Sequence, residues 1–188
     1  MSRPAVLDRI EAMGFKVFEG ELNVNLIGVR SVSREANKFD DHLHLCYQTG
    51  GRWVEHVYTI TTDPGTYWLA NPSNVDGTAI LVPGQYRGAY AIGLHRGKYE
   101  ALVQAGKVAV YRDGDRDNVL DPDVPAEWGH YGINIHRASA HRTSTAVEKW
   151  SAGCQVFADP EQFAQFLSVV KASMEVYGDR VTYTLIGD

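Results

Sequence analysis

The sequence has only two cysteines, Cys46 and Cys154, among its 188 residues, and it contains no long uninterrupted apolar run. Two cysteines cannot supply the disulfide framework on which many small secreted domains depend. A membrane-spanning helix needs about 20 consecutive apolar residues, whereas residues 1–14 carry charged side chains among their apolar ones. We therefore expect no membrane span and no signal peptide, synthesis in the cytoplasm, and two free thiols in preference to a disulfide.

Basic residues are also scarce. The chain has 18 Lys and Arg against 23 Asp and Glu, a net charge of -5, and it has no cluster of basic residues. This balance gives no basic field for nucleic acid, so we expect no nucleic-acid partner. Internal repeats and linker-like tracts are absent too, and 44% of the residues are hydrophobic, which is enough for a sizeable core. We predict one domain over residues 1–188, with an N-terminal helix and strand in residues 1–35 and the core in residues 36–188.

The hydrophobic pattern indicates short strands with a few helices. Apolar residues recur at helical spacing over residues 4–13 and over residues 160–177, where Asp159 is placed as N-cap and Gly178 as terminator. Alternating or continuous apolar runs bounded by turn residues predict strands at residues 22–27, 43–47, 53–61 and 181–186. The predicted fold class is mainly β with a few helices (α+β).

The most informative motif pairs a histidine with a cysteine. His136 is followed, after fourteen residues, by Ser151-Ala152-Gly153-Cys154. A thiol becomes a strong nucleophile when a nearby base takes its proton and a polar pocket favours the anion. The segment between the two, residues 137–150, is rich in small and polar residues and reads as a loop that returns two strand ends to one place. We predict Cys154 as nucleophile and His136 as base; the alternative is a buried, inert cysteine after a turn.

The residues beside Cys154 fit the same chemistry. The amides of Gly153 and Cys154 are placed to stabilise the oxyanion of a tetrahedral intermediate, where one donor contributes about 3 kcal/mol. Ala152 and Gly153 are small enough for a substrate carbonyl to approach the backbone. We expect Trp150, Ser151 and Gln155, which flank the nucleophile, to contact the substrate.

At these residues the chain resembles the L,D-transpeptidase (YkuD-type) catalytic domain, whose signature is a histidine followed at this distance by Ser/Thr-His-Gly-Cys. Ile133-Asn134-Ile135-His136 is similar to the family's strand leading into its histidine, and Ser151, Gly153 and Cys154 match the later positions. Thr62-Asp63-Pro64-Gly65-Thr66-Tyr67 resembles an upstream turn of the family. The resemblance runs from about residue 54 to residue 185. Two positions depart from the pattern: Ala152 stands where the family usually has His, and Val156 where it tends to have Arg.

The resemblance implies an L,D-transpeptidase-like β-sandwich that acts on bacterial peptidoglycan stem peptides through a thioester acyl-enzyme, with no required cofactor. Hydrolysis, as in a phage or prophage peptidoglycan-degrading enzyme, is the favoured outcome, because the Arg position is missing and no export signal is present. Cross-linking by transpeptidation is the alternative. The protein would then reach the cell wall after release or delivery by other factors.

A second motif is acidic. Asp113, Asp115, Asp117 and Asp121 recur at the spacing of the first part of a calcium loop, although the glycine and the terminal glutamate of such loops are missing. Bound calcium, a solvated acidic turn and contact with a cationic group of the substrate all remain open.

Two readings from other classes compete with the thiol enzyme. A strand would place His42, His44 and Cys46 on one face, where they could bind zinc in a zinc-dependent hydrolase. The alternative is a half-exposed strand whose outer face is polar and binds no metal. The second competitor is a non-catalytic wall-binding module that keeps the fold without turnover.

Overall fold

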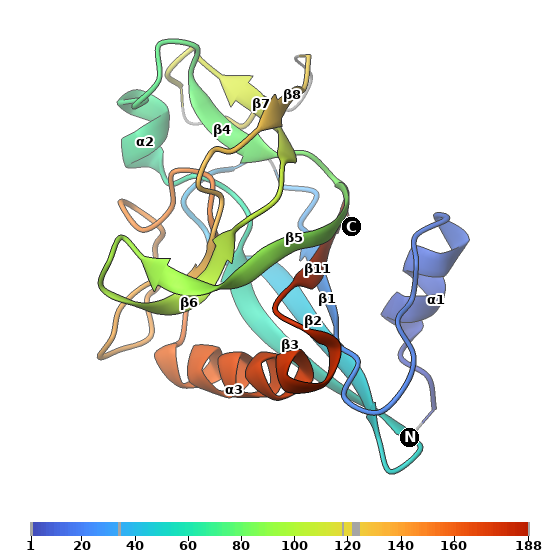
Figure 1. Cartoon of the computed structure of the whole chain (residues 1–188). Coiled ribbons are helices and arrows are strands. Elements are labelled where there is room, and N and C mark those ends of the chain that lie inside the picture. Colours follow the sequence, from blue (N-terminus) through green and yellow to red (C-terminus); the bar gives the residue numbers. More distant parts are fainter. Residues whose placement is uncertain (1, 34, 118, 122–124, 188) are drawn as a thin grey trace.

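The main sheet of the protein closes into a barrel. The computed structural model describes residues 2–33, 35–117, 119–121 and 125–187 (Figure 1). In spatial order the barrel strands are β1 (Asn25–Arg30), β11 (Val181–Gly187), β5 (Gly84–His95), β6 (Tyr99–Gln104), β9 (Ile135–Arg137), β10 (Gln155–Phe157), β3 (Arg52–Thr61) and β2 (Asp41–Thr49). A separate three-stranded sheet contains β4 (Thr78–Leu81), β7 (Val108–Asp113) and β8 (Glu127–Gly129).

The predicted fold class is confirmed: the chain is mainly β with a few helices. The predicted sandwich of two sheets is not confirmed, because β2 pairs with β1 and thereby closes the main sheet on itself. Neighbouring barrel strands are antiparallel except for two parallel pairs, β1 with β11 and β9 with β10. The small sheet and α2 (Thr66–Ala70) lie together at one end of the barrel, and α3 (Pro160–Tyr177) lies near the other end (Figure 1).

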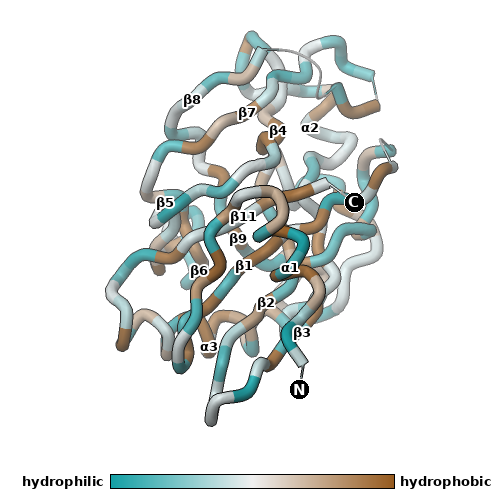
Figure 2. Tube along the Cα trace, turned by 90° about the vertical axis from the view of Figure 1, so that its right-hand side faces the viewer, coloured by the Kyte–Doolittle hydropathy of each residue, from teal (hydrophilic) through white to brown (hydrophobic). Residues whose placement is uncertain are grey.

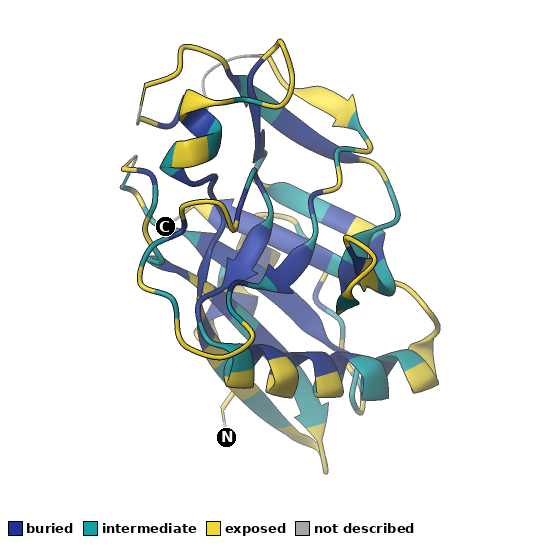
Figure 3. Cartoon of the chain, turned by 90° about the vertical axis from the view of Figure 1, so that its left-hand side faces the viewer, coloured by how far each residue is buried: buried dark blue, intermediate teal, exposed yellow. Residues whose placement is uncertain are grey.

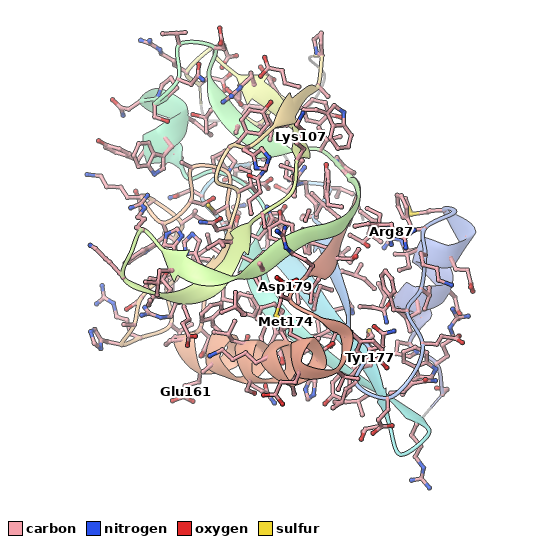
Figure 4. All side chains as sticks on the ribbon, in the orientation of Figure 1. Arg87, Lys107, Glu161, Met174, Tyr177 and Asp179 are labelled. Carbon is pink, nitrogen blue, oxygen red and sulfur yellow. The ribbon has the colours of Figure 1, made fainter. Side chains whose placement is uncertain are left out.

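Helix α3 follows the sequence prediction at both ends. Asp159 accepts hydrogen bonds from the backbone N–H groups of Glu161 and Gln162, and Gly178 ends the helix with a φ of +99°. The apolar face of α3 packs on the barrel, where the rings of Phe163 and Phe166 contact Phe157 of β10. Figure 4 shows this polarity, with Met174 on the barrel side of the helix and Glu161 on the outer side.

The barrel interior is the main core. It holds the largest buried side chains, including Leu43, Leu45, Ile60, Tyr90 and Tyr183. Apolar residues concentrate along the strands while the connections are more polar (Figure 2). The strands in the middle of the barrel and the inner side of α3 are buried, whereas β8 is largely exposed (Figure 3). A glycine makes room for one of the large rings: a Cβ on Gly28 would lie 1.9 Å from the Tyr183 hydroxyl.

The N-terminal segment covers the outside of the barrel. Helix α1 (Ala5–Ala12) packs Val6, Leu7 and Ile10 into a second cluster that contains Ile27 and Cys46. The strand predicted at residues 22–27 is found as β1 and lies between β11 and β2, so residues 1–35 contribute a strand to the barrel itself. None of the helices in the described residues combines the length and apolar content needed to cross a bilayer.

Candidate active site

Parallel pairing brings the two signature residues to one face of the barrel wall. In β9 and β10, Gln155 is opposite Ile135 and Val156 is opposite His136. Side chains alternate along a strand, so Cys154, two residues before Val156, lies on the face of His136 and diagonal to it. This is the arrangement that the spacing of the motif predicted.

The connector, residues 138–154, is irregular but fastened to three parts of the protein. The Ser144 N–H donates to the carbonyl of Ala158 at 2.9 Å, and the Val147 N–H donates to the carbonyl of Asn37 at 3.2 Å. The carbonyl of Ser151 accepts a hydrogen bond from the Gly65 N–H at 3.0 Å. The connector is therefore held in place well before it reaches Cys154.

The upstream turn and the cysteine turn, the two segments that carry the family resemblance, meet in space. A Cβ on Gly65 would lie 2.0 Å from the carbonyl oxygen of Glu148, so the close approach requires glycine. Just beyond the turn, Trp68 donates its Nε1–H to the carbonyl of Lys149 at 3.2 Å. The turn at residues 62–67 thus supports the segment that leads into Ser151.

Ser151 and Gly153 shape the turn before the nucleophile. The Ser151 hydroxyl donates to the carbonyl of Cys154 at 2.8 Å and accepts the Gly153 N–H at 3.1 Å. Gly153 has a φ of +113°, and a Cβ there would lie 2.2 Å from the carbonyl oxygen of Ala79. Because the Gly153 amide is already bonded inside the turn, the Cys154 amide is the remaining one of the two predicted oxyanion donors.

Cys154 is partly buried and its sulfur has two polar neighbours. The Asn134 N–H donates to Sγ at 3.4 Å, and the thiol donates to the carbonyl of Gly132 at 3.4 Å. Burial raises the pKa of the thiol to about 11, with the Asn134 N–H and the Arg96 charge acting in the opposite direction. The sequence predicted a pocket that favours the anion, whereas the resting group in this structure is the neutral thiol.

His136 is almost fully buried, with 2% of its surface exposed. Its Nδ1–H donates to the carbonyl of Arg137 at 2.8 Å, and Tyr99 donates its hydroxyl to the same carbonyl at 3.0 Å. The hydroxyl of Tyr99 also lies 3.2 Å from Nδ1. Because the carbonyl can only accept, we assign the proton to Nδ1 and the lone pair to Nε2, which has no hydrogen-bond partner among the described residues. Burial and then the neighbouring His95 lower the pKa of His136 to about 3. The sequence could not name this orienting carbonyl.

His95 is a site residue to which the sequence assigned no role in the thiol chemistry. It ends β5, and its ring stacks on the ring of His136 with centroids 3.9 Å apart. Its Nδ1 lies 3.1 Å from the side-chain amide nitrogen of Asn134. The only local signal was its place between Gly93 and Gly97, which indicates a turn and no more.

Cys154 and His136 each line a cavity. A cavity of about 460 Å³ is lined by Cys154, and one of about 470 Å³ by His136. His95, Arg96 and Trp150 line both, so they stand between the two chambers. Within the described residues, every charged side chain that lines either cavity is basic: Arg96, Arg112, Lys98, Arg137 and Lys149.

The three predicted substrate-contact residues differ in position. Trp150 is 43% exposed and lines both cavities, as a contact residue would. Ser151 and Gln155 are fully buried. Gln155 accepts a hydrogen bond from the hydroxyl of Tyr183 at 2.8 Å inside the barrel. In this structure, Ser151 and Gln155 therefore stabilise the fold and line neither of these two cavities.

The acidic motif follows β7. Asp113 is fully buried, its Oδ2 accepts the Asp121 N–H at 3.2 Å, and its Oδ1 has no hydrogen-bond partner among the described residues. Asp115 and Asp117 accept the N–H groups of Asp117 and Val119. Residues 118 and 122–124 of this motif lie outside the described part of the chain.

The proposed zinc ligands lie on the outer face of β2. His44 Nδ1 is 2.8 Å from Oε1 of Glu55, and the Cys46 thiol is 3.8 Å from the same oxygen, whereas His42 is exposed. Across the described residues, no three His, Cys, Asp or Glu side chains are already gathered as a metal-binding group.

Comparison with protein-family models, with curated proteins and with solved structures finds no match to this chain.

Proposed function

We propose that the protein is a cysteine-dependent peptidase that hydrolyses the stem peptides of bacterial peptidoglycan through a thioester acyl-enzyme. The observation that carries the proposal is the position of Cys154, which directly precedes β10, next to His136 in the adjacent parallel strand β9. Cys154 also lines a cavity of about 460 Å³. The resemblance of the sequence motif to the L,D-transpeptidase catalytic domain supports the choice of peptidoglycan as substrate. It rests on the matched motif positions and the docking of the turn at residues 62–67 against the connector.

The geometry supports general-base catalysis. At neutral pH the thiol of Cys154 is protonated and His136 is neutral, because burial raises the pKa of the thiol and lowers the pKa of the imidazole. As Sγ attacks the substrate carbonyl carbon, the thiol proton moves to Nε2 of His136, which then delivers it to the leaving amine. Among the described residues, Nε2 of His136 has no hydrogen-bond partner and the thiol of Cys154 donates to the carbonyl of Gly132, so this transfer requires the thiol to turn toward Nε2 when substrate binds.

The two chambers fit the two halves of a cleaved peptide. The acyl part would occupy the cavity beside Cys154, and the leaving amine would depart through the cavity beside His136, which protonates it. Water entering the second chamber releases the acid and completes hydrolysis. An amine entering there would give the cross-link of a transpeptidase, which is the alternative outcome at the same site.

Digestion of purified peptidoglycan tests the proposal and separates the two outcomes. Hydrolysis releases stem-peptide fragments whose masses include one added water, whereas transpeptidation yields fragments joined through a new amide bond. The Cys154→Ser protein is the blank. Absence of any product with the wild-type protein, across several peptidoglycan types, would overturn the proposed substrate.

A further inference from the structure

His95 is held in one protonation state by a neighbour whose orientation is fixed. Oδ1 of Asn134 accepts the Gln104 N–H at 2.9 Å, so the other end of the amide is its NH₂ group. That group lies 3.1 Å from Nδ1 of His95 and must donate to it. Assigned from these hydrogen bonds, the neutral ring of His95 carries its proton on Nε2.

The two stacked histidines therefore have opposite roles. His136 presents a lone pair on Nε2, because its Nδ1–H is bound to the carbonyl of Arg137. His95 presents an Nε2–H, because its Nδ1 is an acceptor. Burial, with the Arg96 charge, lowers the pKa of His95 to about 4, so this donor stays neutral in the working range.

Of the two predicted oxyanion donors, the cysteine turn leaves the Cys154 amide, so a second donor has to come from elsewhere. The Gly153 amide is bonded to Ser151 Oγ, and Ala152 offers no side-chain donor. His95 lines the chamber that reaches Cys154, and it is held by Asn134, whose own N–H contacts the cysteine sulfur. The side chain of His95 and the backbone N–H of Asn134, which contacts the sulfur, are thus linked through the side-chain amide of Asn134.

We propose that His95 is a catalytic residue that donates its Nε2–H to the substrate acyl oxygen when Cys154 attacks. The inference rests on the proposed thiol chemistry. As the S–C bond forms, the carbonyl electron pair moves onto this oxygen, the thiol proton goes to Nε2 of His136, and His95 stabilises the oxyanion without giving up its proton. Collapse of the intermediate breaks the bond to the leaving group, which takes the proton from His136.

The test compares two reactions of the Cys154 thiol in a Cys46→Ser background, which leaves a single cysteine. Acylation by 4-nitrophenyl acetate passes through an oxyanion, whereas alkylation by iodoacetamide does not. His95→Phe keeps a ring against His136 but removes the donor. We expect its acylation rate to fall about 100-fold while alkylation changes less than about twofold.

A matched pair of amides sharpens the result. The amide of Gln reaches about as far as Nε2 of histidine, and that of Asn only about as far as Nδ1. His95→Gln should therefore restore part of the acylation rate and His95→Asn should not. This pair decides the matter even where the Phe variant fails to fold.

Three outcomes would overturn the role of His95. They are an equal fall in both reactions, which indicates a structural effect, unchanged acylation in His95→Phe, and equal rates for the Gln and Asn variants. Peptidoglycan takes no part in these measurements. A wild-type protein that is acylated by the ester but digests no peptidoglycan would contradict the proposed substrate and still decide the role of His95.

Discussion

The two cysteines lie in regions of the barrel that treat a thiol differently. Cys46 is buried under α1 and next to Glu55, and burial together with that acidic neighbour raises its pKa far above the usual value. Cys154 is also shielded, but it has the N–H of Asn134 and the charge of Arg96 beside it and a cavity in front of it. Burial alone therefore does not distinguish Cys46 from Cys154, the thiol that we propose as nucleophile. The two differ in the sign of the neighbouring charge and in access to a cavity.

The largest expected effect is that of exchanging each sulfur for oxygen. Cys154→Ser should lower peptidoglycan cleavage by about a thousandfold or more, because a hydroxyl beside a base of low pKa is a poor nucleophile. Cys46→Ser should leave the rate within about twofold, since nothing reaches that side chain from the cavities. Rates on the same peptidoglycan preparation, with melting curves for both variants, make the comparison. Loss of cleavage in Cys46→Ser with survival in Cys154→Ser would favour the zinc reading of the β2 residues.

Removal of the base should have the next largest effect. His136→Ala should lower kcat about 100-fold to 10,000-fold, because the proposed mechanism transfers the thiol proton to His136. His141→Ala is the control, since His141 is exposed and lines the same cavity. Steady-state rates of both variants decide it. A larger loss of activity in His141→Ala than in His136→Ala would indicate that His141 is the base.

The pH dependence of thiol labelling separates the two sites more finely. With a pKa of about 11, the alkylation rate of Cys154 should rise about tenfold per pH unit between pH 7 and pH 9. His136, with a pKa of about 3, stays neutral over this range and adds no inflection. Cys46 should remain unlabelled in the folded protein. A flat profile for Cys154 would instead indicate a preformed thiolate–imidazolium pair.

The smallest expected effect concerns the acidic motif, for which bound calcium, a solvated turn and contact with a cationic group of the substrate are the alternatives. Burial first, and then the charges of Asp115, Asp121 and Asp117, raise the pKa of Asp113 to about 6. A carboxyl whose pKa is raised on folding destabilises the protein as pH rises from its unfolded pKa of about 4 through its folded value of about 6, so metal-free protein should lose stability there.

Millimolar calcium, added after chelation of carried-over metal, should raise the melting temperature at pH 7.5 by a few degrees. Asp113→Asn should be more stable than wild type without calcium and should lose the calcium response. An unchanged melting temperature in wild type would leave a solvated acidic turn.

Helices and strands could be predicted from the sequence where the hydrophobic pattern extended over many residues. The face of α3 and the caps at Asp159 and Gly178 were visible because they recur at fixed offsets, and β11 was visible from its alternation. Closure of the barrel was not, because pairing between β1 and β2 or between β9 and β10 depends on contacts that local propensity does not encode.

The same division holds at the site. The spacing of His136 and Cys154 predicted their proximity, since the connector could only return one strand beside the other. His95 could not be assigned, because it comes from a different hairpin and its role depends on a ring stack and on the orientation of Asn134. Gln155 was assigned to substrate because it follows the nucleophile, but alternation along β10 turns it into the barrel.

The hydrogen bonds that hold the connector place Cys154 without relying on the covalent link to His136. Ser144, Val147 and Ser151 each anchor the segment that carries Cys154, all of them downstream of residues 139–142. His136 is anchored independently by β6 and β10 through its own strand. We therefore expect that the polypeptide could be cut at residues 139–142, or its termini relocated there by circular permutation, with Cys154 and His136 still in register.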